Sequence, residues 1–221
     1  MYEILMQANK ERGVYAYSHC IHNKSTNPFH IKRFPKPIKP EEVKEVDANI
    51  YYFGHFQAPT SSVRKWSEDT SHPFVFEEWV VAHNGVLNNL DELHKKYCPS
   101  AKIQVDSSII PLMLKFYSTD ISDKAVAPEI AIKDALEKLQ GTFALWIINR
   151  KHKRAFLARQ GSTLYFNSKT GSFSSVECKS KYWISMPEGY VYEIDLKNKA
   201  IFPLNKFQTN SPFLFIPDEQ K

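Results

Sequence analysis

Two short apolar runs, each followed by a glycine, constrain the fold of this 221-residue chain more than any other feature. Residues 50–53 (Ile-Tyr-Tyr-Phe) run into Gly54, and residues 79–83 (Trp-Val-Val-Ala-His) run into Asn84-Gly85. Short apolar runs bounded by turn residues are typical of buried strands, and Asn-Gly is a dipeptide that readily adopts positive φ. The pattern therefore predicts two buried strands that, if they lie side by side, deliver polar loops to one rim of a sheet.

The remaining segments predict a mixed pattern of helices and strands. Residues 2–11 have helical spacing, and a second amphipathic helix is predicted over 129–139. Residues 29–40 lie among prolines at 28, 35, 37 and 40, which favour a loop or irregular arm. Apolar β-type runs between residues 142 and 194 predict an antiparallel sheet. We therefore expect one domain over residues 1–196 and a C-terminal extension, packed on that domain, over 197–221.

Composition and charge narrow the class of protein. A content of 43% hydrophobic and 14% aromatic residues is sufficient for a packed core. The formal charge is +5, but the basic residues are spread along the chain, which disfavours a nucleic-acid partner. No apolar run approaches the roughly 20 residues of a membrane span, and the first residues do not resemble a secretory signal. The expected location is the cytoplasm, with no membrane partner.

Cysteine and histidine usage predicts neither disulfides nor a metal site. Cys20, Cys98 and Cys178 are an odd number at wide spacing, which indicates reduced thiols. Residues 19–22 (His-Cys-Ile-His) include ligand types, but a strand would divide them between two faces. We therefore predict no metal and no cofactor.

Polar residues that follow the predicted strands form a candidate site. Thr60, Asn84, Gly85 and Asp106 could converge on one small ligand at the rim of the sheet. The Gly85 N–H and the Asn84 side-chain amide are a plausible pair of oxyanion donors, and the Asp106 carboxylate could hold a ligand ammonium. The simpler alternatives are that Asn84-Gly85 is only a turn and that Asp106 caps the helix predicted after it.

The order of these motifs resembles the glutaminase domain of class II glutamine amidotransferases, the family that includes amidophosphoribosyltransferase, glucosamine-6-phosphate synthase and asparagine synthetase. The resemblance covers roughly residues 4–195. Its motifs are Gly54-His55-Phe56-Gln57-Ala58-Pro59-Thr60, His72-Pro73-Phe74, residues 81–89, Asp106-Ser107-Ser108-Ile109, and later segments at 141–145, 157–161 and 186–194.

The resemblance implies an α+β fold, a four-layer αββα sandwich of the N-terminal-nucleophile hydrolase type. In active members an N-terminal cysteine attacks the side-chain amide of glutamine, its own α-amino group acts as the base, and ammonia leaves. By motif, Asn84 and Gly85 would form the oxyanion hole and Asp106 would hold the substrate ammonium. Gln57, Ala58 and Thr60 fall in the substrate-binding segment, where Thr60 would contact the carboxylate.

Two departures from the family pattern qualify that expectation. The chain begins at the helix that follows the family's first strand, so the strand and its cysteine are predicted to be missing. Gln57 stands where much of the family has an arginine that grips the glutamine carboxylate, and a neutral amide cannot make that charge-assisted bidentate contact. Arg64, seven residues on, is the nearest candidate to replace it.

Three functions remain open from the sequence. The first is a glutaminase whose cysteine comes from an upstream segment, with a separate synthase or water accepting the ammonia. The second is a catalytically inactive homologue that binds glutamine or regulates another protein. The third is a structural or nucleic-acid-associated domain that shares only the architecture.

Overall fold

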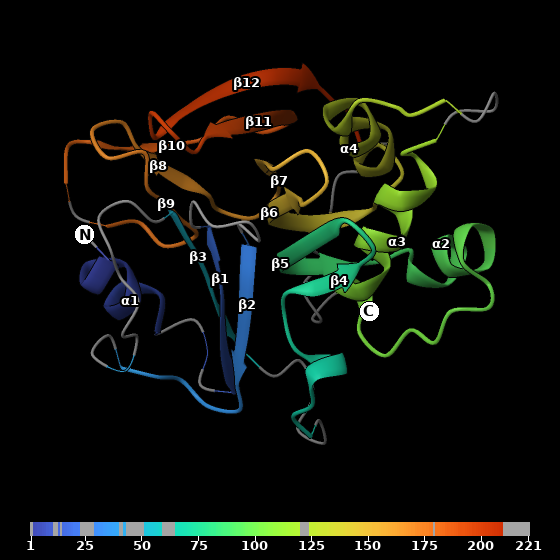
Figure 1. The fold of residues 1–221 in the computed structure, drawn as a ribbon, viewed down its shortest axis with the longest axis horizontal. Coiled ribbons are helices and arrows are strands. Elements are labelled where there is room, and N and C mark those ends of the chain that lie inside the picture. Colours follow the sequence, from blue (N-terminus) through green and yellow to red (C-terminus); the bar gives the residue numbers. More distant parts are fainter. Residues whose placement is uncertain are drawn as a thin grey trace, which may run out of the picture.

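The computed structural model describes residues 2–10, 13, 15–22, 29–39, 42, 51–58, 65–119, 124–178 and 180–209. In these ranges the strands form one six-stranded sheet and two three-stranded sheets (Figure 1). None of the described helices is long and apolar enough to cross a bilayer.

The six-stranded sheet is antiparallel throughout and forms the centre of the molecule. Its order is β12-β11-β7-β6-β5-β4. The strand bounds are β4 (Phe74–Phe76), β5 (Trp79–Leu87), β6 (Gly141–Asn149), β7 (Arg154–Gln160), β11 (Tyr190–Asp195) and β12 (Ala200–Lys206). The strand predicted over 79–83 is confirmed as the first part of β5, and the antiparallel sheet predicted after residue 142 is confirmed.

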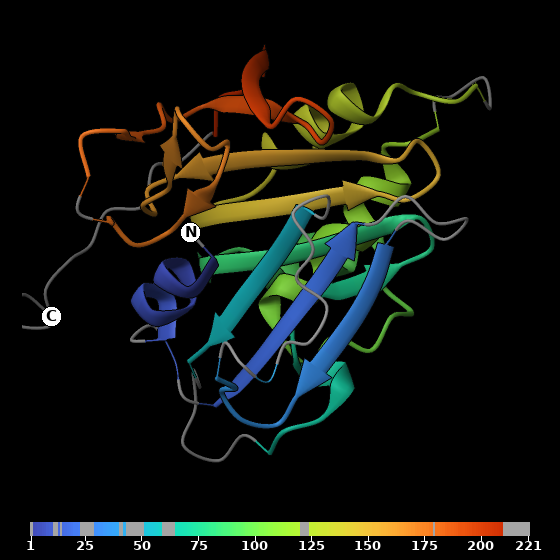
Figure 2. The same cartoon turned by 60° about the vertical axis from the view of Figure 1, so that its left-hand side comes forward.

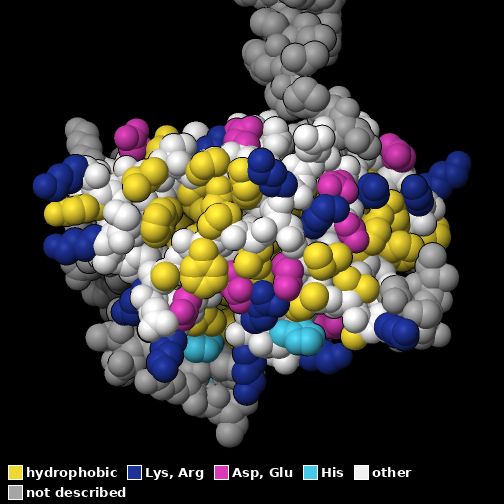
Figure 3. Space-filling model, turned by 90° about the horizontal axis from the view of Figure 1, so that it is seen from above, with side chains coloured by type: hydrophobic (Ala, Val, Ile, Leu, Met, Phe, Trp, Pro, Cys, Tyr) yellow, Lys and Arg dark blue, Asp and Glu magenta, His cyan; other side chains and the backbone are white. Residues whose placement is uncertain are grey.

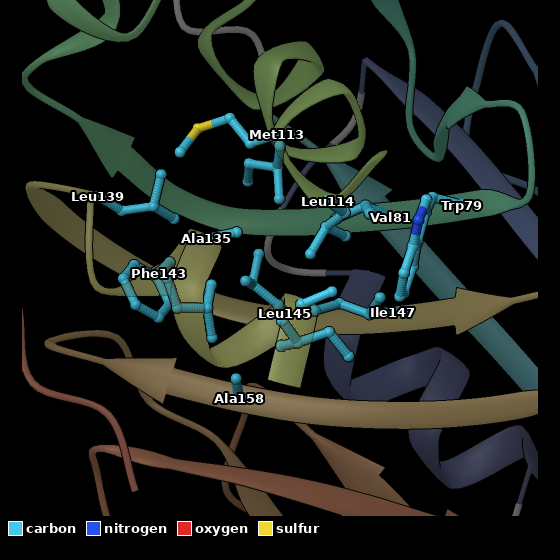
Figure 4. Packing of buried hydrophobic residues seen from close by; sticks show 14 of the residues in the cluster. Trp79, Val81, Met113, Leu114, Ala135, Leu139, Phe143, Leu145, Ile147 and Ala158 are labelled. Atoms are coloured by element: carbon cyan, nitrogen blue, oxygen red, sulfur yellow. The ribbon is translucent and has the colours of Figure 1, made fainter. Parts of the chain in front are cut away.

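Helices α2 (Leu90–Tyr97), α3 (Ile109–Phe116) and α4 (Pro128–Leu136) cover one face of the six-stranded sheet. The apolar residues of α3 and α4 that face the sheet, such as Met113 and Ala135, pack against alternate residues of β5 and β6 (Figure 4). Trp79 and Val81 are fully buried in this cluster. The period-two alternation of a strand then places Val80 and Ala82 on the opposite face.

The opposite face of the six-stranded sheet packs against the sheet β2-β1-β3, whose strands cross it at an angle (Figure 2). These strands are β1 (Ala16–His22), β2 (Phe29–Phe34) and β3 (Tyr51–Gln57). Cys20 and Phe53 contribute to the core between the two sheets, together with Val80 and Trp146. The Trp146 Nε1–H donates to the Gly54 carbonyl at 3.2 Å and so ties β6 to β3.

Strand β2 corrects the prediction of an irregular arm over residues 29–40. Its six residues pair antiparallel with β1 from Tyr17↔Phe34 to His22↔Phe29. The prolines at 28 and 35 flank this segment and do not interrupt it, so every residue of β2 keeps its backbone N–H for the ladder.

Helix α1 (Tyr2–Lys10) lies outside the three-stranded sheet. Its Met6 packs with Tyr17 and Phe56, which are on the face of that sheet opposite to Cys20. The described elements therefore follow the order helix, sheet, sheet, helices. Four complete layers and a missing first strand stay predictions.

The third sheet is small and adjoins β3. It consists of β8 (Tyr165–Asn167), β9 (Phe173–Ser174) and β10 (Trp183–Ser185) in the order β10-β8-β9. The rings of Phe53 and Phe173 lie 5.8 Å apart between centroids, which places β9 beside β3. Asn9 of α1 also donates to the Ser174 Oγ at 2.9 Å.

Strand β12 is formed by residues of the predicted C-terminal extension and pairs with β11. Phe202 and Leu204 of β12 are exposed. On the face seen from above, hydrophobic, basic and acidic side chains are interspersed (Figure 3), as expected for basic residues that are spread along the sequence. Residues 210–221, the rest of the predicted extension, lie outside the described part of the chain.

Candidate functional site

A cavity of about 450 Å³ lies between the six-stranded sheet and the sheet β2-β1-β3, where β3 and the end of β5 meet. Strand β3, residues 82–85 of β5 and α1 all contribute to its lining, as does the small sheet. One end is polar and is called here the polar end of the cavity; it is lined by His55, Gln57, His72, His83, Asn84, Gly85, Asp106 and Ser107. The structure thus brings Asn84, Gly85 and Asp106 to one cavity, together with Gln57 and Ala58.

The hydrogen-bond pattern of β5 fixes the direction of the Gly85 N–H. At the end of the β5–β6 ladder the Asn88 N–H donates to the Gln140 carbonyl at 2.8 Å. Because hydrogen-bonded pairs alternate in an antiparallel ladder, Asn84 bonds toward β6, whereas Gly85 points its N–H away from β6. The Leu87 N–H points in the same direction as that of Gly85. We call this side of residues 83–87 the open edge of β5, because the pairing with β4 ends at Val81.

Gly85 has a backbone conformation that only glycine adopts readily. Its φ is +146°, and a Cβ atom added there would lie 2.0 Å from the Thr142 carbonyl oxygen and 2.8 Å from the His83 Nε2. The interpretation of Asn84-Gly85 as only a turn is wrong, because β5 continues through both residues to Leu87. Glycine is required because the chain there lies directly against β6.

Asp106 lies beside the open edge of β5. Its Oδ2 accepts the Leu87 N–H at 3.0 Å, and its Oδ1 accepts the Ser107 N–H at 2.8 Å and the Ser107 hydroxyl at 3.2 Å. A carboxylate has about four lone-pair sites, so Oδ2 retains capacity for a ligand donor. The prediction that Asp106 caps the following helix is wrong: Ser108 occupies the N-cap of α3, and Asp106 begins a short 3₁₀ turn.

Two buried histidines flank the open edge. The His83 ring contacts the Ser107 Oγ at 2.8 Å and the Thr142 carbonyl at 3.1 Å. Burial lowers the pKa of His83, and the charge of Asp106 offsets part of that shift. The His55 Nε2–H donates to the His83 carbonyl at 3.2 Å, and burial lowers the pKa of His55 to about 4. Both rings are therefore neutral at pH 7.

Gln57 faces the cavity from β3, but both polar atoms of its side chain are engaged by the protein. Its Nε2 donates to the Thr70 carbonyl at 3.1 Å, and its Oε1 accepts the His72 N–H at 3.2 Å. The side chain is 3% exposed. Ala58, at the end of β3, is exposed and lines the cavity. Thr60 lies outside the described residues, and the predicted contacts of all three with substrate stay predictions.

None of the chain's three cysteines reaches the cavity. Cys20, Cys98 and Cys178 are buried free thiols and are absent from its lining. Burial raises the pKa of Cys20 to about 12 and also raises the pKa of Cys98 and Cys178. These thiols are therefore poor nucleophiles. In the described ranges no group of three or more potential metal ligands comes together.

The sequence missed two features of the site. The ring of His72 lies 4.2 Å from that of His55 between centroids, so the His-Pro-Phe motif supplies a wall of the cavity. Ser107 touches both Asp106 and His83. Both residues stand in segments that carried the resemblance, but neither contact could be derived without the fold.

Comparisons with known proteins identify the family of this chain. A family model described as "Glutamine amidotransferase domain" matches residues 62–180, more than half of the chain. A 7-cyano-7-deazaguanine synthase of Saccharolobus solfataricus is 34% identical over 141 residues, which cover 61% of this chain and 29% of that protein. A glutamine–fructose-6-phosphate aminotransferase of Bartonella henselae is 29% identical over 98 residues, 43% of this chain and 15% of that protein. The chain therefore spans about a third or less of the length of the curated relatives it matches.

Solved structures show the same fold. A glutamine phosphoribosylpyrophosphate amidotransferase from B. subtilis superposes with a TM-score of 0.68 at 15% identity, over 95% of this chain and 46% of that chain. A structure described as the allosteric regulatory enzyme of purine biosynthesis gives a TM-score of 0.72 at 16% identity with the same coverage. The expected N-terminal-nucleophile hydrolase fold is confirmed.

Proposed function

Because the chain belongs to the family of glutamine amidotransferase domains, we propose that its cavity binds glutamine and that the domain releases ammonia from the glutamine side chain. The observation that carries the proposal is the convergence of Asn84, Gly85 and Asp106 at the polar end of the cavity. Two hydrogen-bond donors there suit an oxygen that gains negative charge, and the carboxylate suits the ligand ammonium.

The reaction requires a nucleophile that the three cysteines of this chain do not supply. The thiol would give its proton to the α-amino group and attack the side-chain carbonyl carbon, so that a C–S bond forms. The C–N bond would then break as the amide nitrogen takes up that proton and leaves as ammonia. Water would then hydrolyse the thioester to glutamate. The Gly85 N–H and the Asn84 amide would stabilise the oxyanion in both steps.

We propose that an additional segment with a terminal cysteine brings this nucleophile along β3. Among the described strands, β3 pairs only with β1, and every residue of β3 except Phe53 lines the cavity. An unpaired strand edge is a template for another strand. A segment that pairs there would run along the cavity to its polar end.

A second function, a module that binds glutamine without turnover, has its own support. All three thiols are buried with raised pKa values, and the Gln57 side chain is engaged by Thr70 and His72. A domain of this kind would regulate another protein according to whether glutamine is bound. The two functions share the ligand and differ only in the nucleophile.

The acceptor of ammonia is proposed to be a synthase on a separate chain or domain. Several relatives carry the names of synthases or aminotransferases and are about three or more times as long as the segments that match this chain. The glutaminase reaction supplies ammonia, which such enzymes would consume. Water accepts the γ-glutamyl group in either case. Without a synthase that uses the ammonia, the ammonia would be released into the solvent.

The test combines mass spectrometry with activity. Intact mass and N-terminal sequencing of the protein from its natural source would identify a terminal cysteine, and ammonia release from glutamine would be measured on that protein and on its Cys→Ser variant. Activity that depends on this cysteine supports the glutaminase. Stabilisation by glutamine without ammonia release supports the binding module. If glutamine neither stabilises the protein nor releases ammonia, both functions are refuted.

Asp106→Asn is the matched variant for ligand binding. The single oxygen of asparagine can still accept the Leu87 N–H, whereas the Ser107 N–H loses its acceptor and the negative charge is lost. Urea unfolding of the variant without ligand measures what the lost contact costs. We expect the apparent affinity for glutamine, measured from the stabilisation at increasing glutamine concentrations, to fall at least tenfold. Asp91→Asn, an exposed residue of α2 outside the cavity, should behave as wild type.

A further inference from the structure

Gln57 attaches residues 70–72 to the end of β3. Its Nε2 donates to the Thr70 carbonyl at 3.1 Å, its Oε1 accepts the His72 N–H at 3.2 Å, and the residue is 3% exposed. The backbone of Gln57 is itself held in place. Its carbonyl accepts the Tyr15 N–H at 3.1 Å, and a Cβ atom added at Gly13 would lie 2.2 Å from that carbonyl oxygen. Gln57 is therefore a fixed point from which residues 70–72 are placed.

The His72 ring packs on the His55 ring and supports it. The two ring centroids are 4.2 Å apart, with 33° between the ring planes. His55 and Gln57 are two residues apart in β3, so their side chains lie on the same face of that strand. The His55 Nε2–H donates to the His83 carbonyl at 3.2 Å and so joins β3 to the open edge of β5. A chain of contacts therefore runs from Gln57 through His72 and His55 to β5.

This contact chain reaches the open edge of β5 two residues from Gly85. Strand β5 pairs with β6 along its whole length, so the bond from His55 fixes the end of β3 against a backbone that the ladder already holds. The Trp146 N–H gives β3 a second tie to the six-stranded sheet, at the Gly54 carbonyl. Replacing Gln57 should therefore disturb the His55 ring without separating the two sheets.

We infer that Gln57 is a positioning residue. Through His72 it keeps the His55 ring bonded to β5, and this bond sets the distance from the end of β3 to the Gly85 N–H. The consequence for catalysis rests on the proposed function, in which the nucleophile comes along β3 and the Gly85 N–H would stabilise the oxyanion. A misplacement of about 1 Å between such groups can lower a rate by about 100-fold. The competing role, a direct contact of Gln57 with the ligand, would act on binding and would not depend on His72.

Two variants interrupt the contact chain at different points, and a third is their control. Gln57→Leu removes both hydrogen bonds of the amide, whereas His72→Ala removes the ring but keeps the backbone N–H that Gln57 binds. Asn89→Leu is the control because the buried Asn89 amide also joins two backbone groups. It donates to the Lys138 carbonyl at 2.9 Å and accepts the Gln140 N–H at 3.0 Å, and Asn89 is not part of the cavity lining.

NMR of the histidine rings in the full chain tests the contact chain independently of activity. In the wild type and in Asn89→Leu we expect a close ring contact between His55 and His72 and a slowly exchanging His55 Nε2–H. Gln57→Leu should lose the ring contact. Both Gln57→Leu and His72→Ala should speed the exchange of that N–H at least tenfold, because it is no longer held on the His83 carbonyl. Unchanged His55 signals in Gln57→Leu would overturn the inference.

Ammonia release by the protein with its natural amino terminus tests the consequence for catalysis. We expect Gln57→Leu and His72→Ala each to lower kcat at least tenfold, with KM changed less than threefold. The double variant should be no slower than Gln57→Leu, since residues in one contact chain do not act additively. A raised KM with unchanged kcat in Gln57→Leu would indicate a ligand contact and overturn the inference. If the wild type has a terminal cysteine and releases no ammonia, the proposed function fails, and the histidine signals alone decide whether Gln57 positions His55.

Discussion

Replacing Gly85 by alanine tests the backbone geometry on which the proposed oxyanion donor depends. A methyl group at this position would lie 2.0 Å from the Thr142 carbonyl oxygen and 2.6 Å from its carbon, at a φ of +146°. A residue forced into a sparsely populated conformation costs about 1–3 kcal/mol, and relieving the clash by moving β6 adds about 1–3 kcal/mol. We expect a loss of about 3 kcal/mol or more, which for a domain of this size lowers the unfolding temperature by about 6–12 °C.

Gly54→Ala provides the matched control. A Cβ atom at Gly54 would meet no atom closer than 3.5 Å, the Tyr17 hydroxyl, and φ there is not in the positive range. Its unfolding temperature should change by less than about 4 °C, since a tolerated Gly→Ala change is worth about 0.4–1 kcal/mol. Calorimetry of both variants would decide the question. If Gly85→Ala unfolds within about 2 °C of Gly54→Ala, the conformation of Gly85 and the direction of its N–H are wrong.

Three further predictions concern stability and reactivity. Asp106→Ala leaves the Leu87 N–H without its acceptor and should cost about 1–3 kcal/mol in urea unfolding; a smaller loss than that of Asp106→Asn would contradict this contact. Burial lowers the pKa of His55 to about 4, so the unfolded chain takes up a proton near pH 6.5 that the folded chain refuses. Stability should therefore fall as the pH drops from about 6.5 to 4, less steeply in His55→Gln, and equal slopes would exclude His55 as the cause. Burial raises the pKa of Cys20 to about 12, so a thiol reagent at pH 8 should leave Cys20 unmodified in the folded protein. In urea the same reagent should modify it. Rapid modification of Cys20 in the folded state would refute its burial.

The parts of the fold that could be predicted are those with a strong local pattern. The apolar run at 79–83 became a central strand because every residue of it is buried, on one face or the other. Asn84, Gly85 and Asp106 could be proposed as neighbours from the order of the motifs. The reason given for it was wrong, because the strands at 50–53 and 79–83 belong to different sheets and Asn84 and Gly85 lie within β5. The contact that joins Asp106 to β5, its bond with the Leu87 N–H, links residues 19 positions apart and has no local signal.

The parts that could not be predicted depend on tertiary partners. Prolines near Phe29–Phe34 suggested a loop, but only the pairing with β1 shows that they flank a strand. Gln57 was interpreted as a weakened ligand contact because it replaces an arginine in the motif. Its partners, Thr70 and His72, lie 13 and 15 positions further along the chain, and a buried amide takes whichever donors and acceptors the fold provides.

The open edge of β5 holds the proposed oxyanion donor apart from the groups that other segments bring to the cavity. Alternate residues of this edge are roughly 7 Å apart. The His83 carbonyl accepts from His55, the Leu87 N–H donates to Asp106, and the N–H of Gly85, between them, points away from β6. Strand β5 pairs with β6 along its whole length, and its first residues pack in the helical core, so the backbone at Gly85 is held by the ladder. Gln57 comes from β3 in the other sheet, so a different residue at this position would change the polar end of the cavity without moving the backbone of β5.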